Sequence, residues 1–213
     1  MTSPKMVVGL LVVLCFFSIG VVSATGGTIY ETYDSEYFSV EYPPDWNVKR
    51  SLDAEKEGWE YTFTNTDSTD YITLTIGADE IDLFVWTSLN NIQNGSFDAQ
   101  IQHFLDTLSF KNDDTAEADV SQNMTYKLYG NVYFSVESPQ NWYTDKITLD
   151  SGEGTVYRFG DSDWSTRIGV TFQTFGSHGD VTSTTVQVPR DSVNSGKFED
   201  PVQNFLDTLT FKM

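Results

Sequence analysis

The sequence contains one pattern twice, and this constrains the fold more than any other feature. "IYETYDSEYFSVEYPPDW" (29–46) matches "TYKLYGNVYFSVESPQNW" (125–142) at 9 of 18 positions, at an offset of 96. "FDAQIQHFLDTLSFK" (97–111) matches "FEDPVQNFLDTLTFK" (198–212) at 9 of 15, at an offset of 101. Ordinary composition gives roughly one match in each window. We therefore interpret the chain as a tandem duplication built from two similar halves.

The duplication divides the chain into four predicted parts. They are a signal peptide (1–24), a first copy (28–111), an acidic linker (112–124) and a second copy (125–213). The linker "NDDTAEADVSQNM" has four acidic residues and no basic or aromatic residue, which is typical of a connecting segment.

The amino-terminal segment has the layout of a secretory signal peptide. A start containing Lys5 is followed by the apolar run "MVVGLLVVLCFFSIGVV" and by "VSA", which predicts cleavage after Ala24. A retained membrane anchor is the alternative, because a run of this length is at the lower limit for a membrane span. Cys15 is the only cysteine and leaves with the leader, so we expect a secreted or cell-surface protein without disulfides or thiol chemistry.

The charge of the mature chain is strongly negative. Without Lys5 it carries 31 acidic against 11 basic residues, a formal charge of −20. Such a field repels nucleic acid and anionic lipid, so neither is an expected partner. It suits divalent cations or a basic partner, and plain solubility is the alternative explanation.

In each copy, apolar residues recur every second residue in the first part and about every 3.6 residues near the end. Alternating apolar residues predict strands around residues 38–42, 59–63 and 72–76 and at the equivalent places of the second copy. Apolar residues at i, i+4, i+7, i+8 and i+11 then predict a helix from Phe97 and another from Phe198. We therefore predict an α+β class, with an antiparallel sheet and a carboxy-terminal helix in each copy. Because one copy is small for a stable core, the copies are expected to pack together.

Two quoted motifs carry a resemblance to a known family. "YFSVEYPPDW" and "YFSVESPQNW" resemble the opening of PsbP-like domains, and "FLDTLSFK" and "FLDTLTFK" resemble their helix-into-strand end. The most specific positions are Pro43, Trp46, Pro139 and Trp142. The resemblance implies a sandwich fold, as in the related Mog1 and DcrB proteins. It also implies no enzyme, but an extrinsic or envelope protein that binds larger assemblies.

No catalytic residue is predicted. A Ser-His-Asp arrangement needs a base held by a carboxylate and a nucleophile on a fixed turn, and no "GxSxG" stretch is present. The only histidines, His103 and His178, have no counterpart in the other copy, and surface positions are the expectation for both.

Two acidic loops are candidate calcium ligands. Asp67 and Asp70 lie in "NTDSTD", and Asp161 and Asp163 lie in the equivalent "DSDWS". Alternating oxygen-bearing residues on a tight loop can converge on Ca²⁺. Short Asp/Ser/Thr runs are also ordinary hairpin-loop chemistry, which is the alternative.

Two further pairs of residues are candidates for a surface role. Trp86 and Trp164 have no partner in the repeat and are predicted contact residues, with packing near the helix as the alternative. Asn94 and Asn123 begin N-glycosylation sequons.

These observations predict a non-enzymatic, secreted or cell-surface binding or assembly module. Its expected partner is an envelope or extracellular protein, with no cofactor. A calcium-responsive module and a carbohydrate-binding surface protein are the alternatives.

Overall fold

The computed structural model describes most of the two copies. The described residues are 29–88, 91–92, 96–111, 124–149, 154–175, 179–190, 193–194, 197–198 and 200–212. The predicted signal peptide (1–24) and linker residues 112–123 lie outside them.

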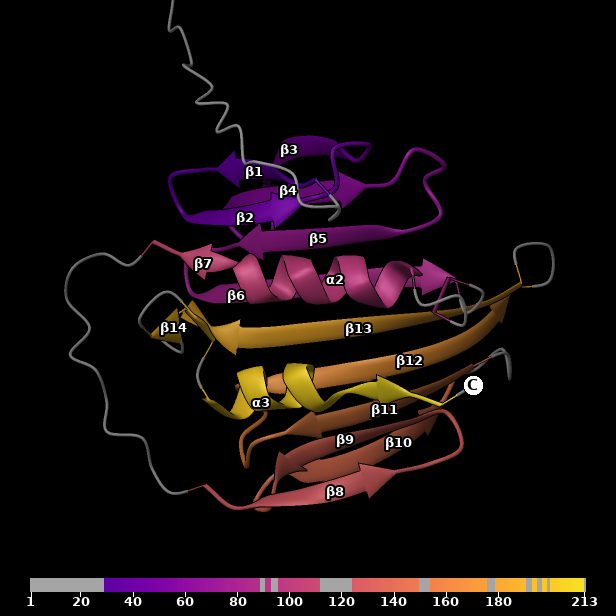
Figure 1. The fold of residues 1–213 in the computed structure, drawn as a ribbon. Coiled ribbons are helices and arrows are strands. Elements are labelled where there is room, and N and C mark those ends of the chain that lie inside the picture. The colour runs from indigo at the N-terminus through magenta and orange to yellow at the C-terminus, as the bar shows by residue number, and fades with distance from the viewer. Residues whose placement is uncertain are drawn as a thin grey trace, which may run out of the picture.

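The elements follow the same order in both copies, except that the second has an additional two-stranded sheet, β14-β15, before its helix (Figure 1). The first copy contains β1 (Glu31–Asp34), β2 (Phe38–Tyr42), β3 (Asn47–Asp53), β4 (Gly58–Thr64), β5 (Tyr71–Ile76), β6 (Glu80–Ser88), α2 (Ser96–Thr107) and β7 (Ser109–Phe110). The second contains β8 (Tyr126–Gly130), β9 (Phe134–Pro139), β10 (Tyr143–Thr148), β11 (Gly154–Gly160), β12 (Arg167–Phe175), β13 (Gly179–Pro189), β14 (Val193–Asn194), β15 (Lys197–Phe198), α3 (Asp200–Thr208) and β16 (Thr210–Phe211).

The predicted α+β class is wrong, because the protein is mostly β. Strands hold 58% of the described residues and helices hold 14%. The expected strands and both helices are present, but β3, β6, β10 and β13 add two long strands to each copy. β3 and β10 are edge strands with largely exposed side chains, so they carry no clear apolar alternation. In β6, Phe84 and Trp86 on the second face obscure the alternation of the buried face.

The two copies join into one antiparallel sheet of eight strands. Its order is β10-β11-β12-β13-β6-β5-β4-β3, with four strands from each copy. β6 pairs with β13 at the centre, from Glu80↔Pro189 to Ser88↔Val181. The copies therefore share backbone hydrogen bonds as well as side-chain packing.

The central pairing has local twofold symmetry. Phe84 pairs with Thr185, and these two residues are also equivalent in the repeat, at an offset of 101. Equivalent strands that pair antiparallel about equivalent residues form the intramolecular version of an isologous dimer contact. The symmetry axis passes through the sheet between Phe84 and Thr185.

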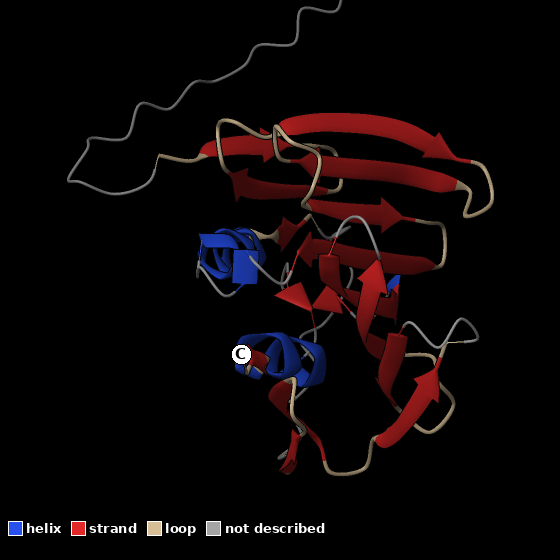
Figure 2. Cartoon of the chain, turned by 90° about the vertical axis from the view of Figure 1, so that its right-hand side faces the viewer, coloured by secondary structure: helices blue, strands red, loops and turns tan. Residues whose placement is uncertain are grey.

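The second layer lies on one face of this sheet. Figures 1 and 2 show α2 and α3 side by side on that face, and they run in opposite directions, as the axis requires. The small sheets β1-β2-β7 and β8-β9-β16 cover the outer parts of the same face. Phe38 of β2 contacts Tyr61 of β4 with ring centroids 4.9 Å apart, and Phe134 and Tyr157 repeat this contact at 5.3 Å.

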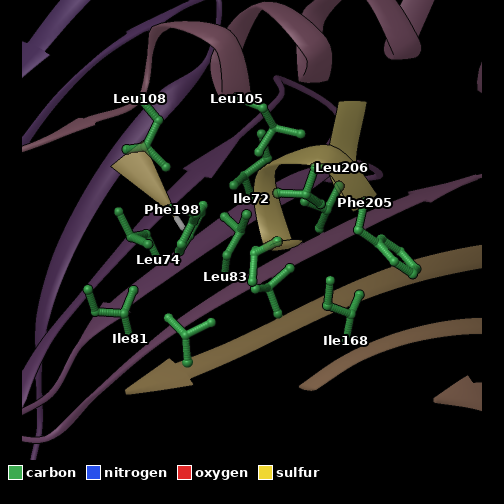
Figure 3. Packing of buried hydrophobic residues seen from close by; sticks show 14 of the residues in the cluster. Ile72, Leu74, Ile81, Leu83, Leu105, Leu108, Ile168, Phe198, Phe205 and Leu206 are labelled. Atoms are coloured by element: carbon green, nitrogen blue, oxygen red, sulfur yellow. The ribbon is translucent and has the colours of Figure 1, made fainter. Parts of the chain in front are cut away.

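A single hydrophobic core runs through both copies. Leu83 of β6 and Val186 of β13 are fully buried partners across the central pairing. We call the β6–β13 pairing, with the side chains packed on it, the seam. Figure 3 shows Leu105 and Leu206 from the two helices above the seam, with Phe198 beside Leu74. Because neither half can separate without exposing this surface, we expect the copies to unfold together.

Polar contacts close one end of the seam. Lys56 Nζ donates to Glu80 Oε1 at 2.8 Å, and Gln187 Nε2 of the other copy donates to Glu80 Oε2. Arg190 of the second copy also donates to the Gly77 carbonyl at 3.2 Å. The hydrogen bond from Lys56, against the opposing effect of burial, holds the pKa of Glu80 below its ordinary value.

Replacing Leu83 by Ala should destabilise both copies at once. A buried Leu→Ala change costs about 2–5 kcal/mol in the free energy of unfolding. Urea unfolding followed by tryptophan fluorescence and by circular dichroism should give one coincident transition, shifted to lower urea. Leu52→Ala, at a side chain that is 66% exposed, is the control and should change little. Two separate transitions would contradict the shared core.

The Glu80 contacts should make stability depend on acid. A carboxyl whose folded-state pKa is lowered contributes stability above its ordinary pKa, 4.5 for this group, and loses it as the pH falls through the lower folded value. Between about pH 6 and pH 3, Glu80→Gln should therefore lose less unfolding free energy than the wild type. Exposed Glu55→Gln serves as the control. Parallel pH profiles for Glu80→Gln and the wild type would refute this role.

Candidate functional site

A groove lies between the two helices, above the central strands. Its volume is about 510 Å³, within the range of small-molecule sites in proteins. α2 and the end of β6 form one side, and the end of α3 with β16 forms the other. The lining residues are Val85, Thr87, Ile92, Ala99, Ile101, Gln102, Leu105, Thr182, Ser183, Thr184, Leu206, Asp207, Leu209, Thr210 and Phe211.

The groove spans the twofold axis and extends toward one end of the seam. Leu105 and Leu206 are equivalent residues, and both line it. At the other end, the ring of Phe110, just after α2, contacts the ring of Phe198, just before α3, with centroids 5.2 Å apart. Both rings are buried. We call these the open end and the closed end.

The floors of the two ends differ in polarity. The floor pairs at the open end are Thr87–Thr182 and Val85–Thr184. Their symmetry counterparts at the closed end are Val188–Ile81 and Val186–Leu83. Three buried threonines at the open end thus take the places that aliphatic side chains hold at the closed end.

Most polar side chains of the groove already donate a hydrogen bond to the protein. Thr87 Oγ1 donates to Asp70 Oδ1 at 2.8 Å, and Thr182 Oγ1 donates to the Thr171 carbonyl at 2.8 Å. At the rim, Gln102 Nε2 donates to Asp106 Oδ1 at 2.8 Å. Thr210 Oγ1 donates to the Thr208 carbonyl at 3.3 Å, and Asp207 Oδ1 accepts from Gln203 Nε2 at 2.9 Å.

Asp70, a predicted calcium ligand, is a buried anchor of its loop. Its side chain is 2% exposed and accepts hydrogen bonds from Asn65 Nδ2 at 2.7 Å and from Thr87 Oγ1. Thr69 Oγ1 and Asn91 Nδ2 also donate to it, at 3.0 and 2.5 Å. This carboxylate therefore ties the β4–β5 loop to the end of β6 and to the floor of the groove.

The other predicted ligands occupy matching hairpin turns. Asp67 is exposed, and in the second copy Asp161 Oδ2 accepts from the backbone N–H of Thr166 at 3.1 Å. Asp163 Oδ1 accepts from the backbone N–H of Ser165 at 3.1 Å. The equivalent residues Ser68 and Trp164 both have positive φ, 56° and 61°. The turn geometry explains why oxygen-bearing residues recur here.

The strand register places the two loops at opposite ends of the strands, because β6 and β13 run antiparallel. Tyr71, after the first loop, pairs with Trp86 near the end of β6, whereas Arg167, after the second loop, pairs with Gln187 near the end of β13. The four aspartates therefore cannot form one site. Among the described residues, no group of three or more His, Cys, Asp or Glu side chains is arranged to hold a metal ion. Calcium binding by either loop stays a prediction.

The two predicted contact tryptophans lie apart from the groove and from each other. Trp86 is in β6, on the sheet face opposite the helices, where its ring lies 6.0 Å from that of Tyr71 at 13°. Trp164 packs over Gly160, where an added Cβ would lie 2.6 Å from its ring, and Arg158 lies 5.5 Å from its ring centroid. Packing is thus the role seen for Trp164.

The sequon residues Asn94 and Asn123 lie outside the described residues, as does His178, for which a surface position is the expectation. His103 is described: its Nε2 lies 2.8 Å from Glu41 Oε2, and its ring stacks on Tyr30 with centroids 3.6 Å apart. His103 thus connects α2 to β2, and it is not part of the groove lining.

No family model matches the chain, and no curated protein matches it. The resemblance to PsbP-like domains therefore rests on the quoted motifs alone and stays a prediction. Among the described residues, no helix has the length and apolar character needed to cross a membrane.

Asp70→Ala should destabilise the protein far more than Asp67→Ala. Removing the buried acceptor breaks the hydrogen bonds that Asn65, Thr87 and Asn91 donate to this carboxylate, which should cost about 3 kcal/mol or more. The exposed Asp67 should change the unfolding free energy by about 0.5 kcal/mol or less. Chemical denaturation without added metal measures both. Equal, small effects would contradict the anchoring role of Asp70.

Proposed function

We propose that the protein is a non-enzymatic, secreted or cell-surface binding module whose site is the groove between α2 and α3. One observation carries the proposal. The two ends of the seam are related by symmetry, yet among the described residues only the open end has a floor of threonines, where the closed end has aliphatic side chains. Thr87 and Thr182 already donate within the protein, and the acceptor capacity that their oxygens keep on an otherwise apolar floor favours contact with a ligand.

The shape of the groove favours a small ligand over a partner helix. One turn of a helix about 10 Å across and 5.4 Å long occupies roughly 420 Å³. A groove of about 510 Å³ would hold little more than one such turn. The apolar walls, formed by Ile101, Leu105, Leu206, Leu209 and Phe211, instead suit an elongated molecule with an apolar body.

The expected extracytoplasmic location comes from the leader and the acidic composition. Attachment to an envelope assembly, which the PsbP-like motifs imply, is compatible with this proposal, because it would use surfaces outside the groove. The sheet face that carries Trp86 is one such surface, and the carbohydrate alternative would use the same face.

Binding of a neutral apolar dye, N-phenyl-1-naphthylamine, tests the groove. The mature chain should enhance the fluorescence of the dye at one saturable site. Thr210→Trp places a large ring at the exposed rim and should weaken binding about tenfold or more, since 1.4 kcal/mol of lost contact is tenfold. Ser109→Trp, the equivalent change at the closed end, should leave binding unchanged. Dye binding that neither substitution alters, or no binding at all, would reject the groove as the site.

A further inference from the structure

Two of the three floor threonines offer acceptors rather than donors. The hydroxyl hydrogens of Thr87 and Thr182 are used within the protein, so these floor residues can present only oxygen lone pairs to a ligand. Thr210 at the rim also uses its hydroxyl hydrogen within the protein, in a hydrogen bond to the Thr208 carbonyl. A ligand that brought further acceptors to these oxygens would leave its own polar atoms unpaired, which is costly in a desolvated site.

The charge around the groove also favours a ligand that donates hydrogen bonds, and in particular a cation. Asp207 is the one charged residue of the lining, and no Lys, Arg or His side chain is among the described lining residues. The surrounding chain carries a large excess of acidic residues. This field concentrates cations at the rim and repels anions.

We infer that the ligand is a cationic amphiphile, with an apolar chain between the two helices and a protonated amine directed to the threonine oxygens and Asp207. This inference rests on the proposed function and narrows its ligand class. A protonated primary amine has three donors, which match the acceptor oxygens of Thr87 and Thr182 and the anionic Asp207 at the rim. A carboxylate or sulfate head group would meet acceptors and a like charge.

Displacement of N-phenyl-1-naphthylamine by four decyl compounds tests the inference. Decylammonium has charge and donors, decyltrimethylammonium has charge without N–H donors, 1-decanol is neutral, and decanoate is an anion. All four are used below their micelle-forming concentrations, on the full mature chain. Decylammonium should displace the dye at a concentration at least about tenfold lower than decanoate, with decyltrimethylammonium and decanol between them.

Two matched variants separate the groove from the general surface charge. Asp207→Asn should reduce the preference for decylammonium over decanoate about threefold or more. Asp106→Asn, the counterpart in α2 that does not line the groove, removes the same charge and should retain the preference. Thr182→Val removes one floor acceptor, and an aliphatic residue already occupies its counterpart, Ile81, so the variant is expected to fold. Thr182→Val should weaken the binding of decylammonium more than the binding of decanol.

The outcomes distinguish this inference from the proposed function. Equal displacement by decylammonium and decanoate, with dye binding still blocked in Thr210→Trp, would overturn the ligand class and leave the groove as the site. A preference that Asp207→Asn and Asp106→Asn reduce equally would reflect surface charge and would also overturn it. Loss of groove-dependent dye binding would contradict both proposals together.

Discussion

The pairing of β6 with β13 is the contact on which the rest of the architecture depends. It joins equivalent strands, antiparallel, about the equivalent residues Phe84 and Thr185, and so it fixes a twofold axis through the sheet. The axis places the two helices on the same face in opposite directions (Figure 1). It also brings Leu105 and Leu206 together above the seam. The groove is therefore a product of the junction, and neither copy alone contains it.

Local periodicity was enough to predict most elements but not the fold class. Strands with one buried face, such as β2 and β4, alternate clearly, and the spacing of the closing helices is regular. β3 exposes most of its side chains, and β6 has the aromatic residues Phe84 and Trp86 on its less buried face, so neither shows a clear alternation of apolar and polar residues. Pairing between distant strands is a property of the assembled sheet. The expectation that the copies pack together did not reveal that they share backbone hydrogen bonds.

The candidate site was beyond local sequence reasoning for a related reason. Chemistry-bearing residues drew attention to Asp70 and Trp86, yet Asp70 is used to hold a loop and Trp86 lies within a strand. The informative signal was a difference between the copies. Thr87 is equivalent to the aliphatic Val188, and Thr182 is equivalent to the aliphatic Ile81. That comparison needs the offset of 101 along β6 and β13, whereas the opening motif aligns at 96. The register of β6 and β13 supplies it.

The covalent joining of the two copies changes how such a groove responds to dilution. If the walls belonged to separate subunits, the groove would disappear below the dissociation constant of the dimer. In one chain the second wall is always present at the effective concentration that the connection sets. Its two ends are also encoded separately, so a substitution at one end is not repeated at the other. The chain therefore keeps the geometry of a symmetric dimer while its halves are free to specialise.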